Sequence, residues 1–175
     1  ASGSYIAFLD SDDEWAPDKI KRQVEQLRTT EYEASYTSVK QVDENGEINS
    51  VRHARNEGNL QESLTKSNPI GIFSSLMISK NAIDGNNPLD PDLPCWQDWE
   101  WYLRLSDSVL FGAIVQPLTI RHNEGDQISD SFYPKREQAY PVILQRVRER
   151  LTSERDISTA KSHLQTHLAY AALSN

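Results

Sequence analysis

A short apolar run that ends in a cluster of acids limits most strongly what this chain can fold into. Residues 5–9 (YIAFL) are continuously apolar, and Asp10-Ser11-Asp12-Asp13-Glu14 follows at once. A run of this length predicts a buried strand, and the acids predict a polar loop at its end. Apolar residues at helical spacing over 17–28 predict an amphipathic helix next. Strand, loop and helix in this order favour an α/β fold, whose ligand-binding groups lie at the carboxyl ends of strands.

The rest of the chain is divided by the same periodicity and turn signals. Further strands are predicted at 34–42, 72–78 and 110–115, and further helices at 60–67, 97–106, 140–151 and 164–172. A turn is predicted at 43–46, and loops are predicted at 49–59, 81–94 and 123–131. Two regions follow from this pattern: an α/β region over 1–131 and a helical tail over 132–175.

Composition excludes several classes of protein. The chain has 175 residues, 37% of them hydrophobic and 25% charged, which is typical of a globular domain and not of a disordered chain. Its single cysteine, Cys95, excludes an internal disulfide framework and a multi-cysteine zinc site, and it favours a reducing compartment such as the cytoplasm. The net charge of -8 argues against a general nucleic-acid binder. No apolar run approaches the roughly 20 residues of a membrane-spanning helix.

The acids after the first predicted strand indicate a divalent cation. Crowded carboxylates raise one another's pKa unless a cation lies between them, and Mg²⁺ or Mn²⁺ suits a site that also holds phosphate oxygens. An EF-hand is excluded, because its sixth and twelfth positions would be Trp15 and Lys21. A solvated acidic turn remains an alternative. So does a phosphatase with Asp10 as nucleophile, although Glu14 stands where that class usually has Thr or Val.

The segment around these acids resembles a known family. Residues 2–15 read SGSYIAFLDSDDEW, and Pro17, Lys19-Ile20 and Gln23 follow. This string closely resembles the metal-binding segment of family 2 glycosyltransferases. The resemblance implies a partial GT-A (Rossmann-like) α/β fold and a nucleotide-sugar donor. It also implies that Asp10 and Asp12 contact the ribose-diphosphate and the Mg²⁺ or Mn²⁺ ion, with Asp13 in support.

A second segment resembles the catalytic string of the same family. Residues 94–105 read PCWQDWEWYLRL, where the family usually has Glu-Asp-Trp followed by Leu-Arg-Leu. The resemblance makes Asp98 the catalytic base, which takes the proton of the acceptor hydroxyl. Gln97 replaces the usual Glu, and Trp96, Gln97 and Trp99 are candidate acceptor-binding residues. The alternatives are a helix-capping role for Asp98 and core packing for the tryptophans.

Two further segments agree with this resemblance. Residues 121–129 (RHNEGDQIS) are similar to the family's R-x-H-x-G-x-x-S segment, which makes Arg121 and His122 candidate contacts to phosphate or metal. Residues 68–78 (NPIGIFSSLMI) resemble the strand beneath the acceptor site. The family's donor-binding strands, which precede the acidic segment, have no counterpart here. We therefore expect the later portion of such a domain, which by itself binds nucleotide sugar weakly.

The tail differs from the rest of the chain in charge. Residues 1–134 have a net charge of -11, whereas residues 135–175 have +3. Tail arginines at 146, 148, 150 and 155 would pack on the catalytic region, contact a second copy, or lie on an anionic membrane.

The prediction is therefore an inverting, metal-dependent glycosyltransferase of the cytoplasm or of the cytoplasmic membrane face. Its acceptor would be a sugar, a lipid-linked glycan or a protein glycan, and it would have no nucleic-acid partner. The alternative from another class is a non-catalytic glycan- or protein-binding module with the same fold.

Overall fold

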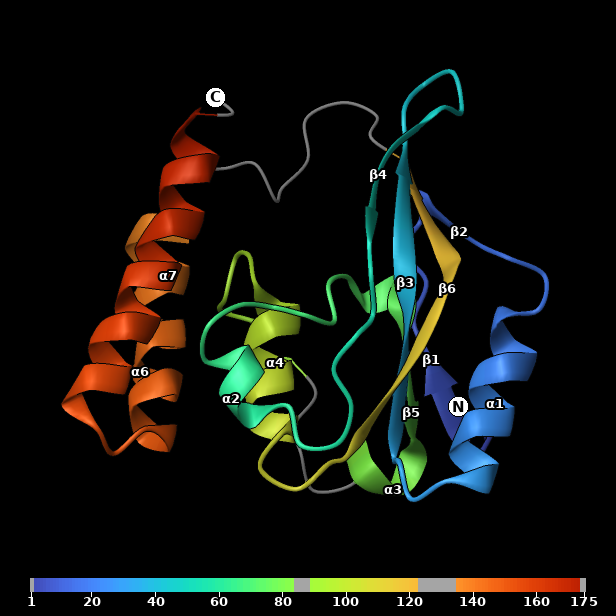
Figure 1. The fold of residues 1–175 in the computed structure, drawn as a ribbon, viewed down its shortest axis with the longest axis horizontal. Helices are drawn as coiled ribbons and strands as arrows, with labels where there is room; N and C mark the ends of the chain where they lie inside the picture. The colour runs from blue at the N-terminus through green and yellow to red at the C-terminus, as the bar shows by residue number, and fades with distance from the viewer. Residues whose placement is uncertain (1, 84–88, 123–134, 174–175) are drawn as a thin grey trace. The chain divides into compact units, whose positions relative to one another are not determined.

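The computed structural model describes residues 2–83, 89–122 and 135–173, and it divides them between two compact units (Figure 1). The first unit comprises 1–60, 69–87 and 108–124, and the second comprises 61–68, 88–107 and 125–175. Each unit therefore joins segments that are far apart in the sequence. The predicted loop at 123–131 and the predicted tail boundary at 131/132 lie outside the described residues.

The first unit is built on a mixed β-sheet. Its six strands are β1 (Tyr5–Ala7), β2 (Asp13–Trp15), β3 (Ala34–Val42), β4 (Ile48–Arg52), β5 (Leu76–Ser79) and β6 (Phe111–His122). The strand order is β1-β5-β3-β6-β2, and β4 pairs with β3 beside this path. Only β3 and β6 run parallel among these pairs, and the others are antiparallel. The helical elements of this unit are α1 (Lys19–Thr29), the 3-10 turn η1 (Phe73–Ser75) and α3 (Lys80–Ile83).

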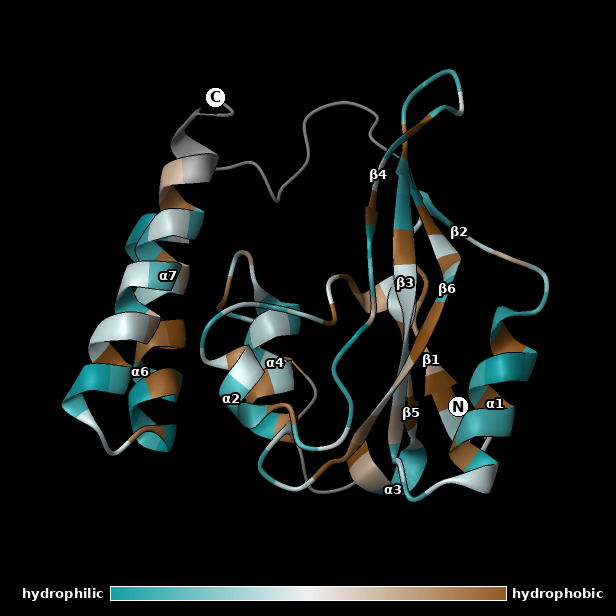
Figure 2. Cartoon of the chain, in the orientation of Figure 1, coloured by the Kyte–Doolittle hydropathy of each residue, from teal (hydrophilic) through white to brown (hydrophobic). Residues whose placement is uncertain are grey.

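The central strand β3 carries the core of the first unit. It agrees with the predicted strand over 34–42, and its residues from Ala34 to Val39 are buried. Tyr36, Ile78 and Phe111 are fully buried around it. Beyond Val42 the chain turns at Gly46, whose φ of 80° favours glycine, and hydrophilic residues dominate this turn (Figure 2). The apolar stretch and the turn residues therefore place β3 and the turn that follows it correctly from sequence.

Helix α1 lies against β3 and β6 (Figure 1), and one side chain fixes it there. Gln23 is fully buried, and its Nε2 donates to the backbone carbonyls of Ser35, at 2.7 Å, and Ser75, at 3.0 Å. Buried amides are stable only when they are hydrogen-bonded, so these contacts set the position of the helix. The observed helix begins two residues after the predicted one and ends one residue later.

Several predicted strands have different bounds in the structure. The first strand ends at Ala7 and is only half-buried, because it pairs with β5 alone at one end of the sheet. The prediction for 49–59 was wrong over 49–52, which belong to β4. All five residues of β4 are exposed. An exposed strand lacks the buried apolar residues from which a strand is predicted, so this polar sequence predicts a loop. The short strand β2 was not predicted, because its residues are mostly acidic.

The remaining differences concern segments completed by tertiary contacts. Residues 73–75 form η1 and not the beginning of a strand, and α3 occupies the first part of the predicted loop at 81–94. Strand β6 continues past the predicted end at 115 to His122, since its polar second half pairs in parallel with β3. Pro117 falls where the β3–β6 register shifts, which is where a sheet tolerates proline.

The second unit is helical. It comprises α2 (Gln61–Leu64), α4 (Gln97–Leu105), a π-helical turn η3 (Lys135–Ala139), α6 (Tyr140–Arg150) and α7 (Glu154–Leu173). Helix α6 packs against α4 and α7. The prediction for α6 was accurate to one residue, whereas α7 begins ten residues before the predicted 164 and α2 is shorter than 60–67. Each helix in the described part of the chain is too short or too polar to cross a lipid bilayer.

Candidate active site

The acidic loop, residues 10–13, follows β1 in the first unit, and its last residue, Asp13, begins β2. The backbone N–H of Asp13 donates to the carbonyl of Asp10 at 3.2 Å, which closes a turn. The backbone N–H of Asp10 donates to Ser74 Oγ at 3.0 Å, and Trp15 Nε1 donates to the Ser74 carbonyl at 2.8 Å. The beginning of the acidic loop and the end of β2 are therefore both tied to the turn η1.

The carboxyl groups of the acidic loop repel one another. Burial raises the pKa of Asp10, and the charge of Asp12 raises it further, while Ser74 and Arg121 act in the opposite direction. Burial also raises the pKa of Asp13, to which Asp10 and Asp12 add their repulsion. A cation among these groups would relieve this repulsion and favour the ionised forms.

The pairing of β2 with β6 places two predicted site residues beside this loop. Asp13 lies opposite Arg121 in the antiparallel register. His122, the last residue of β6, has its Nε2 3.5 Å from Glu14 Oε1. The structure therefore brings Asp10, Asp13, Arg121 and His122 to one end of the sheet, and their roles toward metal and phosphate stay predictions.

The acidic loop suits a metal that arrives with a phosphate-bearing ligand. Within residues 2–83, 89–122 and 135–173, no three His, Cys, Asp or Glu side chains converge as a metal cage would require. Mg²⁺ is usually held by only one or two carboxylates, and phosphate oxygens and water complete its shell. Asp10 and Asp12 match that smaller donor set, and the repulsion described above is the property that a divalent cation would offset.

Asp98 belongs to the second unit and lies in the first turn of α4. The residue before the helix, Trp96, has φ 60° and ψ 22°, a left-handed conformation that is uncommon for residues other than glycine. Asp98 Oδ1 accepts the backbone N–H of Trp99 at 2.7 Å, and Oδ2 accepts Asn68 Nδ2 at 3.2 Å. Each carboxylate oxygen thus has a donor that fixes the side chain, and Asp98 stays half-buried.

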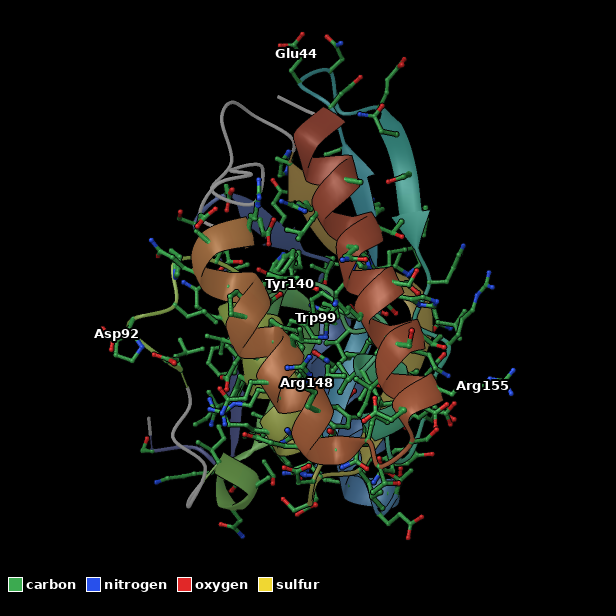
Figure 3. The ribbon with its side chains drawn as sticks, turned by 90° about the vertical axis from the view of Figure 1, so that its left-hand side faces the viewer. Glu44, Asp92, Trp99, Tyr140, Arg148 and Arg155 are labelled. Atoms are coloured by element: carbon green, nitrogen blue, oxygen red, sulfur yellow. The ribbon has the colours of Figure 1, made fainter. Side chains whose placement is uncertain are left out.

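The tryptophans near Asp98 differ in their surroundings. Trp99 is 3% exposed, its Nε1 donates to the Leu64 carbonyl at 2.8 Å, and its ring lies 5.4 Å from that of His167 in α7. Figure 3 shows Trp99 within the second unit, behind the ribbons of α6 and α7. Packing accounts for this side chain. Trp96 and Gln97 are half-buried, so the acceptor role implied for them stays a prediction.

Two residues that hold the site were missed as site residues. Ser74 anchors the acidic loop, and Asn68 donates to Asp98. Both lie in the segment 68–78 that resembles the strand beneath the acceptor site. That similarity was the available signal, but contacts between residues 30 or more positions apart cannot be read from spacing.

The comparisons with known proteins agree with this arrangement. The family model described as "Glycosyl transferase family 2" matches residues 1–85. Those residues are thus similar to family 2 glycosyltransferases. The match contains the acidic loop, Asn68 and Ser74, and it ends before Asp98.

Two curated relatives are described as glycosyltransferases. The chain is 27% identical over 127 residues to an "Uncharacterized glycosyltransferase" of Rickettsia bellii (strain RML369-C), covering 72% of this chain and 18% of the relative. It is 37% identical over 73 residues to a protein of the same description from Rickettsia felis (strain ATCC VR-1525 / URRWXCal2), covering 41% of this chain and 12% of that one. The chain therefore spans less than a fifth of the length of these relatives.

Solved glycosyltransferase structures share the fold. The crystal structure of S. aureus TarS 1-349 in complex with UDP-GlcNAc matches with a TM-score of 0.66 and 14% identity, over 95% of this chain and 49% of TarS. The TarS 1-349 structure described without this ligand matches with a TM-score of 0.59 and 12% identity, over 95% of this chain and 47% of TarS. The α/β fold of this chain is thus that of the GT-A glycosyltransferases.

Proposed function

We propose that this chain carries the acidic loop and the catalytic base of an inverting, metal-dependent glycosyltransferase. The observation that supports this most directly is Asp98, a half-buried carboxylate at the start of α4 with a donor on each oxygen. The family match of residues 1–85 supplies the second support, because it includes the acidic loop.

In the proposed reaction, Asp98 accepts the proton of an acceptor hydroxyl. The oxygen of that hydroxyl forms a bond to the anomeric carbon of the donor sugar from the side opposite the nucleotide. The bond between the anomeric carbon and the diphosphate oxygen breaks, and its electron pair leaves with the nucleoside diphosphate. Attack from the opposite side inverts the configuration at the anomeric carbon. The proton ends on Asp98, which releases it to solvent after the product has left.

Asp10 and Asp12 would hold the metal ion, with Asp13 beside them. When bound, Mg²⁺ or Mn²⁺ supplies Lewis-acid stabilisation of the charge on the departing diphosphate. Arg121 and His122, at the end of β6, would add a guanidinium and an imidazole to the same phosphate groups. The donor is a nucleotide sugar, and UDP-GlcNAc, the ligand in one TarS structure, is the first to test.

Replacing the base tests the proposal. Asp98→Asn keeps the size and shape of the side chain but removes its capacity to take a proton. We expect sugar transfer to fall by roughly 10²- to 10⁴-fold, the usual contribution of a general base, while calorimetric binding of UDP with Mn²⁺ is unchanged. Asp92→Asn is the matched control, because Asp92 is an exposed acid in the loop before α4 (Figure 3).

Full turnover by Asp98→Asn would contradict the assignment of the base. A chain that binds a glycan without any binding of UDP or Mn²⁺ would instead be the non-catalytic module. The two measurements therefore separate an incorrect base from an incorrect class of protein.

A further inference from the structure

The β-sheet extends the face that carries the acidic loop toward β4. Strands β4, β3 and β6 lie side by side (Figure 1), and paired residues of neighbouring strands point to the same face. One row across this face contains Ser50 of β4, Gln41 of β3, Arg121 of β6 and Asp13 of β2. The adjacent row contains Arg52, Val39, Thr119 and Trp15 from the same four strands.

A small cavity lies along these two rows. It measures about 150 Å³, and residues from β3, β4 and β6 line it together with Ile72, which precedes η1. Two of its lining residues are the arginines Arg52 and Arg121. Pockets for whole drug-sized ligands measure about 300–1,000 Å³, so this cavity suits a single small group.

Arg52, which lines this cavity, lies close to a glycine. Gly71 has φ +89°, and a Cβ atom there would lie only 3.2 Å from Nη1 of Arg52 and 3.3 Å from its Cδ. Glycine therefore meets two needs at once, because it adopts the left-handed backbone and lets the arginine side chain approach closely. The exposed side chain of Arg52 therefore lies directly against the backbone of Gly71.

We infer that the cavity bounded by Arg52 and Arg121 binds an anionic group, a phosphate, on the acceptor substrate. This inference rests on the proposed function. Guanidinium groups bind phosphate through paired N–H donors, and Gln41 and Ser50 offer further polar groups beside them. Arg121 also faces the carboxylates of the acidic loop, so Arg52 is the cationic side chain on the side of the cavity away from those acids.

Arg121 lies between the two phosphates in this proposal, because it also faces the donor diphosphate, and Arg52 carries the assignment of the second phosphate to the acceptor. Arg121 lies opposite Asp13, next to the acidic loop where the donor diphosphate would bind. Arg52 lies on β4, two strands away from β6, which is about 10 Å at the usual spacing of strands. A group held by Arg52 is therefore adjacent to the donor site and separate from it.

Calorimetry with three probes on the full chain tests the inference. Glycerol 3-phosphate represents a phosphate-bearing acceptor, glycerol represents the same polyol without charge, and UDP with Mn²⁺ represents the donor. The variant is Arg52→Gln. The control is Arg55→Gln, which removes an exposed arginine three residues further along and outside the cavity.

We expect glycerol 3-phosphate to bind the unsubstituted chain saturably and more tightly than glycerol. Arg52→Gln should weaken this binding by about tenfold or more, since hydrogen bonds between charged groups are the strong ones. Arg55→Gln should leave it unchanged, and UDP with Mn²⁺ should bind Arg52→Gln as before. Arg52→Lys retains the charge without the planar donors, so its affinity for glycerol 3-phosphate should lie between those of Arg52→Gln and the unsubstituted chain. This intermediate affinity separates lost recognition from a failure to fold.

Equal affinity of glycerol and glycerol 3-phosphate would overturn the inference, and so would equal losses in Arg52→Gln and Arg55→Gln. A loss confined to UDP with Mn²⁺ would assign the cavity to the donor diphosphate and overturn the acceptor assignment. Absence of any UDP binding in the presence of Mn²⁺, at concentrations high enough to fill even a weak site, would contradict the proposed function instead, and the phosphate titration would still decide the role of the cavity.

Discussion

At the scale of the residue, Lys19 shows how burial changes the chemistry of a side chain. It is fully buried, its Nζ donates to Gln23 Oε1 at 2.6 Å, and it lies 4.4 Å from the centre of the Trp15 ring. The ring favours the ammonium form, but burial dominates and lowers the pKa of Lys19 to about 7. Lys19 is thus a buried titratable group in contact with Trp15 of β2, the strand that follows the acidic loop.

Lys19 predicts a pH dependence of stability. Between pH 7 and the ordinary lysine pKa near 10.4, the unfolded chain binds a proton that the folded chain does not. The free energy of unfolding should therefore rise with pH across this window, by roughly 1 kcal/mol per pH unit from this residue. Urea unfolding from pH 6 to 9.5 measures the rise, and Lys19→Met should remove it.

Lys21→Met is the control for Lys19, because Lys21 is exposed on the same helix. Subtracting the two variants' pH profiles cancels the titration of every other group. Identical profiles for Lys19→Met and the unsubstituted chain would contradict the burial argument.

Asn68 is a second prediction at this scale. Its Nδ2 donates to Asp98 Oδ2, and donors to a carboxylate favour the charged form that a base needs. Asn68→Ala should lower kcat by about tenfold with little change in KM, and the acidic limb of the pH–rate profile should move to higher pH. Asn81→Ala, at an exposed position in α3, should change neither. A decrease in kcat of the same size at every pH would indicate damage to the fold instead.

At the scale of the element, an ion network joins α4 to α6. Glu100 is fully buried and accepts from Arg104 Nε at 2.9 Å and from Arg146 Nε at 2.8 Å. Arg150 adds a bond from Nε to the Leu103 carbonyl at 3.1 Å. Two of the four tail arginines thus bind within the second unit, whereas Arg148 and Arg155 are exposed (Figure 3). A membrane or subunit contact through the exposed pair stays a prediction.

Removing one cation from this network should destabilise the chain. Arg146→Met leaves Glu100 with Arg104 as a remaining partner, so we expect a loss of about 2 kcal/mol in the free energy of unfolding. Arg148→Met on the same helix should change it by less than about 0.5 kcal/mol. Urea unfolding measures both, and equal effects of the two substitutions would show that the bond to Glu100 contributes nothing.

At the scale of the whole molecule, ligand binding and folding are linked. A ligand that binds only the folded chain stabilises it, by about 2.7 kcal/mol at a hundred times its Kd. UDP with Mn²⁺ should therefore raise the midpoint of unfolding, and Asp12→Asn should abolish the rise by removing a proposed metal ligand. Asp92→Asn should keep it. A rise of the same size in Asp12→Asn would remove Asp12 from the site.

The fold was predictable where local pattern and tertiary role agree. Strand β3, helix α4 and helix α6 follow apolar periodicities that match their burial, so their bounds were close. Strands β2 and β4 were missed because their residues are acidic or exposed, and only pairing with β6 and β3 makes them strands. Asp10, Asp13, Arg121 and His122 are candidate site residues by resemblance, and the pairing of β2 with β6 sets Asp13 opposite Arg121.

The sequence by itself determined the α/β class, the acidic loop and the resemblance to family 2 glycosyltransferases, because these depend on the order and type of neighbouring residues. Only the tertiary structure decided which partners each group has. Ser74 anchors the loop, Asn68 bonds to Asp98, and Arg52 shares a cavity with Arg121. Each of these contacts joins residues that are distant along the chain, and sheet register and packing set such contacts while local sequence does not.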